Sequence, residues 1–228
     1  MQTMIEENIR NIRQKIIKNC AKIKKSSDEI TLIAVSKRKD HKLIEEAVNC
    51  GINNFGENYA QELEKKSKLL SAKNIIWHYI GPIQSNKVKI IAKHANWVHT
   101  LEREKIIKRL NTECSKINKT INACIQINIS SENTKSGCEP SELIEIATLI
   151  ESMKNINLKG IMVLPKLLWS ECEKDNTIKL INTLSLDLQK KFPSASAISF
   201  GTTSDFESAI LNGSNMVRIG ESIFGKRL

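Results

Sequence analysis

The sequence predicts an α/β protein that folds as a single (β/α)8 TIM barrel with an extra N-terminal helix. Eight short apolar runs alternate with stretches of helical period along the 228 residues, and this alternation is typical of parallel strands joined by crossover helices. Eight strands also close such a barrel. The alternative is an open doubly wound sheet, but no GxGxxG motif follows the first strand. Since no Gly/Ser linker or composition break divides the chain, residues 1–228 are expected to form one domain.

The expected elements follow the chain in order. Isoleucines at positions 5, 9, 12, 16 and 23 lie at mostly helical spacing, so residues 1–25 are expected to form an amphipathic helix that packs on the barrel. The expected strands are residues 31–35, 52–55, 75–80, 96–99, 121–129, 158–164, 195–200 and 215–219. The helical patterns between them are residues 41–50, 58–71, 84–94, 102–117, 140–154, 173–191 and 204–212. Asp40 can cap the first of these helices, and Pro140 is suited to open the fifth.

The net charge of +10 raises the question of nucleic-acid binding. The basic residues, however, are spread along the chain beside acidic ones. The aromatic residues (three Trp, two Tyr and five Phe) do not interleave with them as a stacking surface requires. Solvated lysine faces are therefore the favoured interpretation, and tight, salt-dependent RNA binding would overturn it.

The cysteines and the N-terminus point to the cytoplasm. The six cysteines, at positions 20, 50, 114, 124, 138 and 172, form no CxxC pair and no metal-binding cluster with histidine. Scattered single thiols suit a reducing compartment, where they behave as small hydrophobic residues. The N-terminus lacks the apolar stretch of a signal peptide, and there is no run of about 18 apolar residues that could span a membrane.

Small polar residues follow most of the predicted strands, at the end of the barrel where such folds bind ligands. The stretches SFGTTSDF after the seventh strand and VRIGES after the eighth form a candidate phosphate site. Gly201 and Gly220 allow close backbone approach, while Thr202 and Thr203 offer hydroxyls just before a helix. Ordinary turn glycines and capping hydroxyls are the alternative explanation of the same residues.

Lys37 follows the apolar run TLIAV so closely that its stem is expected to begin inside the protein. Partial desolvation lowers the proton affinity of an amine, and Arg38, Lys39 and Arg218 would act in the same direction by like-charge repulsion. A neutral amine at the barrel mouth could attack a carbonyl, and a phosphorylated aldehyde would then give a Schiff base. A lysine that merely extends into solvent is the competing interpretation.

Six motifs run in order through residues 31–228, namely LIAVSKRK, NFGENYAQE, WHYIGPIQSNK, NISSENTKSGC, GIMVLP and FGTTSDFESAI followed by GSNMVRIGESIFGKR. Together they resemble the pyridoxal phosphate homeostasis protein family, the YggS/PROSC-like proteins. The resemblance implies a fold-type III barrel, similar to the N-terminal domain of alanine racemase. It also implies that pyridoxal 5'-phosphate (PLP) is carried as a Schiff base on Lys37.

The resemblance assigns further roles residue by residue. Asn58 would lie beside the cofactor ring, Thr203 would replace the usual serine ligand of the phosphate, and Gly220 would offer it a backbone N–H. Arg218 matches the arginine that faces the pyridine nitrogen, which disfavours ring protonation and weakens PLP as an electron sink. The stretches SKRKD and SFGTTSDF depart from the commoner SKTKP and SMGMS-like sequences. Both keep Lys37 and a phosphate hydroxyl, although the affinity could differ.

Two functions compete for this site. In the first, the protein is a non-catalytic PLP carrier or buffer, and its partners would be PLP-dependent apo-enzymes. In the second, it is an amino-acid racemase, which needs acid/base groups on both faces of the ring. The carrier is favoured because the chain leaves no room for the C-terminal domain of alanine racemase, and because neither Tyr59 nor Tyr79 takes a catalytic position. A cofactor-free Schiff-base aldolase ranks third, and a monomer is expected.

Other reactive side chains are assigned mainly to structure. His78, beside Trp77 on a strand, is expected to be a hydrogen-bonded core histidine, and no histidine has the spacing of a metal site. Glu57 could orient Lys37 or form hydrogen bonds at the strand end. Lys135 is expected to be a solvated loop residue, with transient or secondary PLP binding as the alternative.

Overall fold

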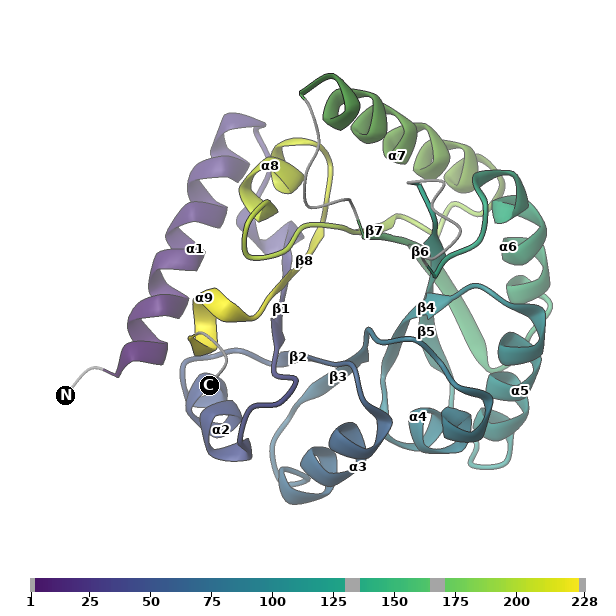
Figure 1. The fold of residues 1–228 in the computed structure, drawn as a ribbon, viewed down its shortest axis with the longest axis horizontal. Coiled ribbons are helices and arrows are strands. Elements are labelled where there is room, and N and C mark those ends of the chain that lie inside the picture. Colours follow the sequence, from purple (N-terminus) through teal and green to yellow (C-terminus); the bar gives the residue numbers. More distant parts are fainter. Residues whose placement is uncertain (1–2, 130–135, 165–170, 226–228) are drawn as a thin grey trace.

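The computed structural model describes residues 3–129, 136–164 and 171–225. Within these ranges, eight parallel strands close into one barrel in chain order, and β8 pairs with β1 to complete it. Figure 1 looks along the barrel, with helices surrounding the ring of strands. The predicted (β/α)8 barrel with an extra N-terminal helix is confirmed.

The strands are β1 (Thr31–Val35), β2 (Asn54–Glu57), β3 (Ile76–Tyr79), β4 (Trp97–Leu101), β5 (Ile121–Ile127), β6 (Ile156–Val163), β7 (Ala197–Ser199) and β8 (Met216–Ile219). The helices are α1 (Met4–Lys22), α2 (His41–Asn49), α3 (Ala60–Leu69), α4 (Val88–His94), α5 (Glu104–Ser115), α6 (Leu143–Glu151), α7 (Glu171–Lys191), α8 (Phe206–Leu211) and α9 (Glu221–Phe224). Single 3-10 turns occupy Ser27–Glu29, Ser85–Lys87 and Pro140–Glu142.

Helix α1 buries the isoleucine stripe that predicted it. Ile5, Ile9, Ile12 and Ile16 are all buried, and the helix packs against α2, α8 and α9. Figure 1 shows α1 on the outside of the barrel, next to the point where β8 meets β1. The Thr3 hydroxyl caps the helix by accepting the Glu6 N–H. The helix therefore covers the seam at which the barrel closes.

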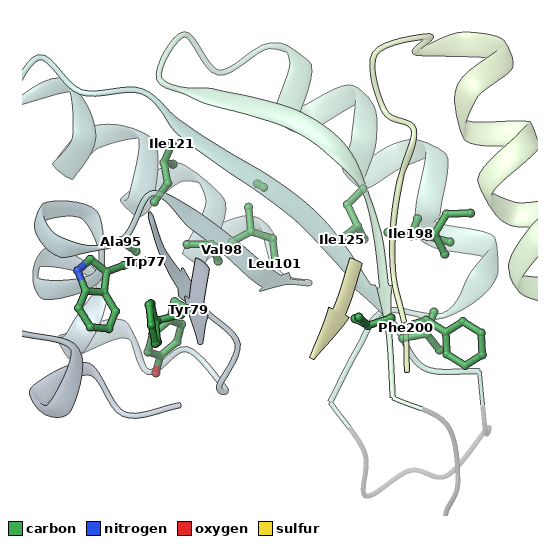
Figure 2. Packing of buried hydrophobic residues seen from close by; sticks show 14 of the residues in the cluster. Trp77, Tyr79, Ala95, Val98, Leu101, Ile121, Ile125, Ile198 and Phe200 are labelled. Carbon is green, nitrogen blue, oxygen red and sulfur yellow. The ribbon is translucent and has the colours of Figure 1, made fainter. Parts of the chain in front are cut away.

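The side chains of each strand alternate between two environments, as strand geometry requires. The outward residues pack against the helices in one large hydrophobic cluster, and Figure 2 shows part of it around Val98, Leu101 and Ile125. A second set of buried apolar residues lies outside that cluster, in the lumen of the barrel: Ile33, Cys124, Met162 and Met216. Other lumen positions carry the buried polar side chains His78, His99, Ser199 and Arg218, which belong to the functional site described below.

The boundaries differ from the prediction most clearly at the second strand. It was expected at residues 52–55 but spans Asn54–Glu57, so Gly56 and Glu57 belong to the strand and do not follow it. A glycine and a carboxylate are poor strand signals, but the Glu57 carboxylate is buried and paired with Lys66 of α3. The ion pair lets the strand continue through a charged residue.

Helix boundaries agree more closely. Asp40 caps α2 through the Lys42 N–H, and Pro140 opens the turn that leads into α6, both as predicted. Helix α8 is shorter than expected, with six residues in place of the predicted 204–212. The short helix α9 after the last strand was not predicted.

Candidate functional site

Lys37 lies just beyond the C-terminal end of β1. Strand pairing continues up to the preceding residue, because the Ser36 N–H donates to the Gly56 carbonyl at 3.0 Å. Ile33 faces the lumen, where it pairs in register with Arg218. Lys37 is the first residue of the turn after this strand, and alternation continued from Ile33 and Val35 would direct it to the same side. Its partly buried side chain therefore starts at the mouth of the lumen.

A buried ion cluster from α3 holds the peptide groups on both sides of Lys37. The Lys66 ammonium, on a side chain only 8% exposed, donates to the Ser36 carbonyl at 2.8 Å and to the Glu62 carboxylate at 2.9 Å. Glu62 in turn accepts the Arg38 N–H at 2.7 Å. Arg38 has a φ of +59°, a conformation that non-glycine residues rarely adopt. The cluster therefore stabilises a strained turn that presents Lys37.

Glu57 completes this cluster on the outer face of β2. Its Oε1 accepts the Ser36 hydroxyl at 2.6 Å and the Lys66 ammonium at 2.8 Å. Burial raises the pKa of Glu57, and the nearby Lys66 partly offsets this effect. Of the two roles considered for Glu57, hydrogen bonding at the strand end fits its position. It acts on Lys37 only through the turn.

Arg218 lies on β8, the strand that pairs with β1 to close the barrel. The residue is only 4% exposed, and its guanidinium donates from Nη1 to the Ser199 hydroxyl at 2.6 Å and from Nη2 to the Val163 carbonyl at 3.0 Å. Burial lowers the pKa of Arg218 to about 10, and Asp205 opposes that effect. The guanidinium is therefore charged at neutral pH. Within the described residues, these two acceptors use two of its five donors.

A line of hydrogen bonds continues from Ser199 across the lumen. The Ser199 hydroxyl contacts His99 Nδ1 at 2.9 Å, His99 Nε2 contacts His78 Nδ1 at 2.9 Å, and His78 Nε2 contacts Asn54 Oδ1 at 2.9 Å. Ser199, His99 and His78 are fully buried, which confirms that His78 is a hydrogen-bonded core histidine. Among the described residues, no cluster of side chains is suited to hold a metal ion.

Both lumen histidines are expected to make the protein less stable in acid. Burial lowers the pKa of His78 to about 3 and that of His99 well below its ordinary value. A histidine with a depressed folded-state pKa takes up a proton on unfolding, so stability falls as pH drops below the unfolded pKa of about 6.5. At about pH 5 each neutral histidine would cost about 2 kcal/mol of stability. Urea denaturation from neutral to acid pH should show this slope.

The variant His78→Gln provides the comparison for the pH prediction, because its side chain keeps a donor for Asn54 and does not titrate. It should lose about half of the acid-dependent slope. An identical slope in the wild type and in the variant would contradict the pKa shift of His78.

The predicted phosphate residues lie in the β7–α8 turn and just after β8. Gly201 has a φ of +99°, and its carbonyl accepts the Arg218 N–H at 3.0 Å. Both donors of Thr202 are already used, because the Asp205 carboxylate accepts hydrogen bonds from its backbone N–H and from its hydroxyl. Within the described part of the chain, the Thr203 hydroxyl and the Gly220 N–H have no hydrogen-bond partner. These two donors are thus available to an anion, whereas Thr202 is already engaged.

Replacing Gly201 with alanine is expected to distort this turn. The added Cβ would lie 2.5 Å from the Ala209 Cβ, and the residue would keep a positive φ. A strained backbone of this kind costs about 1–3 kcal/mol, which thermal unfolding can measure. The double variant Gly201→Ala/Ala209→Gly should recover only the stability lost to the Cβ–Cβ clash, because the positive φ remains. Unchanged stability in Gly201→Ala would show that the turn relaxes freely.

Asn58 follows β2 at the height where Lys37 follows β1. Val35 and Gly56 are register partners on these two strands, and Lys37 and Asn58 each come two residues later. Its Oδ1 is buried and has no hydrogen-bond partner within the described residues. Gly81 packs so tightly here that an added Cβ would lie 2.1 Å from the Asn58 carbonyl oxygen. An unpartnered buried acceptor is costly, so Asn58 fits a site that receives a polar ligand.

The family model for the alanine racemase N-terminal domain matches residues 8–227. The pyridoxal phosphate homeostasis protein of Pasteurella multocida (strain Pm70) is 40% identical over 227 residues, which covers 98% of this chain and 97% of the relative. This chain belongs to the pyridoxal phosphate homeostasis protein family.

Solved structures agree with this membership. PipY of Synechococcus elongatus PCC7942, in a structure with PLP bound, matches with a TM-score of 0.82 and 26% identity, covering 92% of this chain and 100% of that chain. The alanine racemase of Corynebacterium glutamicum matches with a TM-score of 0.76 and 15% identity, covering 99% of this chain and 62% of that chain. The second likeness shows the fold alone.

The structure brings most of the predicted site residues to one end of the barrel. Lys37 and Asn58 lie on the β1–β2 side, and the turn of Gly201 joins Arg218 through a backbone hydrogen bond. The expected role of Lys135 falls outside the described residues. Sequence reasoning missed the buried Lys66 of α3, for which the sequence contains no signal. For the links from Ser199 to His78, polar residues within apolar strands indicated lumen positions but not which residues pair.

Proposed function

We propose that this protein binds PLP as a Schiff base on Lys37 and acts as a non-catalytic carrier or buffer in intracellular PLP homeostasis. The membership of its family and the PLP bound in PipY support the ligand. The observation that carries the site is the placement of Lys37 at the lumen mouth, in a turn held by a buried ion cluster. We place the protein in the cytoplasm as a monomer, with PLP-dependent apo-enzymes as recipients. Among the described residues, no helix is long and apolar enough to cross a membrane.

Each residue at the mouth has a role in holding PLP. The amine of Lys37 would attack the aldehyde carbon in its deprotonated form, a C=N bond would replace the C=O bond, and water would leave. The Thr203 hydroxyl and the Gly220 N–H, which have no partner within the described residues, bind the phosphate on the Gly201 side of the mouth. Thr202 supports that turn through Asp205 and has no direct phosphate contact in this proposal.

Arg218 and Asn58 orient the ring of the cofactor. The Arg218 guanidinium is charged, buried and held at two nitrogens, which suits it to donate to the ring nitrogen. A fixed cation there keeps the nitrogen unprotonated, so bound PLP, which supplies an electron sink in enzymes, is a poor one here. Asn58 offers its unpartnered Oδ1 beside the ring. Strong binding with weak electron withdrawal favours a carrier over a catalyst.

The tyrosines also favour the carrier. The Tyr79 hydroxyl donates to the Pro82 carbonyl at 3.1 Å, on the helix side of β3, and burial raises its pKa to about 12. Tyr59 is exposed and accepts a hydrogen bond from Arg38 outside the lumen. Neither tyrosine is placed to exchange protons with a ligand in the lumen mouth.

Absorbance titration with PLP, followed by an assay for transfer to a PLP-dependent apo-enzyme, tests this function. We expect one PLP per chain, delivery to the apo-enzyme, and no racemisation of amino acids. A racemase turnover that Lys37→Ala abolishes would replace the carrier with the racemase. Failure to bind PLP would refute the proposal as a whole.

A further inference from the structure

The proposed function uses only the first member of the hydrogen-bond line that crosses the lumen, Arg218. Behind it lie Ser199, His99 and His78, three polar side chains with no measurable exposure. Buried polar groups are costly unless they satisfy one another, and an apolar lumen would fold without them. Their presence directly behind the ligand-facing arginine therefore calls for a role at the site.

The chemistry of these groups determines the direction of every bond. Asn54 Oδ1 can only accept, so a neutral His78 donates to it from Nε2 and accepts from His99 at Nδ1, and a neutral His99 accepts the proton of the Ser199 hydroxyl, whose oxygen accepts from Arg218. His99 then carries its proton on Nε2 and donates it to His78 Nδ1. His78 likewise carries its proton on Nε2 and donates to Asn54 Oδ1. All donors point away from Arg218, and each link has one donor and one acceptor.

This direction requires both imidazoles to be neutral. A proton on His99 Nδ1 would leave the Ser199 hydroxyl proton without its acceptor in the lumen. The electrostatics agree, because burial, His78 and Arg218 all lower the pKa of His99. Asp205 and Cys124 are the titratable groups that act on Arg218 from the neighbouring elements, and both favour its charged form. The hydrogen-bond line from Ser199 to His78 is thus uncharged, and it ends at a single cation, Arg218.

We propose that Ser199 and His99 are positioning residues of the PLP site, which hold the Arg218 guanidinium in one orientation toward the ring nitrogen. The inference rests on the proposed function, since the ring is the ligand that Arg218 would meet. Ser199 holds one terminal nitrogen and the Val163 carbonyl holds the other, so the plane of the guanidinium is fixed before ligand arrives. A donor fixed in advance loses less conformational freedom on binding.

Three variants test the link at Ser199. Ser199→Ala removes it, Ser199→Thr keeps the hydroxyl, and Met216→Leu changes another buried lumen residue that has no part in the line. We expect Ser199→Ala to weaken PLP binding by about tenfold to a hundredfold. The pH at which bound PLP changes its absorbance should also rise, because a loosened Arg218 no longer suppresses ring protonation. Ser199→Thr and Met216→Leu should stay within about threefold of the wild type.

Equal losses of affinity in Ser199→Ala and Met216→Leu, or an unchanged absorbance profile in Ser199→Ala, would overturn the proposal. Nitrogen NMR of the ligand-free protein tests the direction of this hydrogen-bond line without PLP. It should show both His78 and His99 neutral with the proton on Nε2, and a proton on Nδ1 of His99 would overturn the proposal. If the wild type failed to bind PLP, the proposed function would be refuted, while the NMR result would still decide the direction of the hydrogen-bond line.

Discussion

Lys66→Met is expected to lower the free energy of unfolding by about 3–5 kcal/mol, the usual cost of removing one partner from a buried ion pair. The substitution leaves the Glu57 carboxylate at 0% exposure without its cation, and Glu57 Oε2 already lacks a hydrogen-bond partner within the described residues. It also frees the Ser36 carbonyl beside Lys37. Urea denaturation monitored by tryptophan fluorescence measures the loss.

Two comparisons isolate the buried pair. Lys68→Met removes an exposed lysine of the same helix, paired with Glu64 at 2.7 Å, and should change stability by less than about 1 kcal/mol. The double variant Lys66→Met/Glu57→Gln removes the unpaired charge and should recover part of the lost stability. Similar effects of Lys66→Met and Lys68→Met would show that the cluster does not hold the turn.

Lys37→Ala is expected to weaken PLP binding by about a hundredfold or more, because the ligand loses its covalent bond to the barrel. Lys37→Arg separates charge from chemistry, since it keeps a cation but cannot form the Schiff base. Both variants should bind PLP weakly in equilibrium dialysis, and both should unfold at the wild-type temperature. Wild-type affinity in Lys37→Arg would mean that the cation alone holds the ligand.

The barrel itself could be predicted from residue patterns. The apolar run TLIAV forms β1, in which Ile33 and Ala34 are fully buried, and the isoleucine stripe of α1 packs as its period indicated. The cap at Asp40 and the helical start at Pro140 could be predicted because both depend on the residue type alone. These features depend on neighbours close in sequence, so local patterns contain them.

The β2 boundary and the α3 lysine could not be predicted in the same way. Glu57 interrupts the strand pattern unless its partner Lys66, nine positions later, is known to be buried with it. A lysine in the run EKK looks solvated, and only the packing of α3 on β2 gives it carboxylate and carbonyl partners. The tertiary contact here overrides the usual preference of charged residues for water.

The hydrogen-bond line in the lumen could not be predicted either, because its members lie far apart in the sequence. His99 and Ser199 are 100 positions apart, and only closure of the barrel brings their side chains within hydrogen-bond distance. Sequence reasoning assigned His78 to the core but had no means of finding its partner. Thr202 differs, because its hydroxyl was expected to face phosphate but is engaged by Asp205, only three positions later.

The most direct measurement is borohydride reduction of the PLP-loaded protein, followed by peptide mapping of the modified lysine. We expect a single stable adduct on Lys37, the amine that the ion cluster presents at the mouth of the barrel. A label found only on another lysine, or no label on a protein that binds PLP tightly, would contradict it.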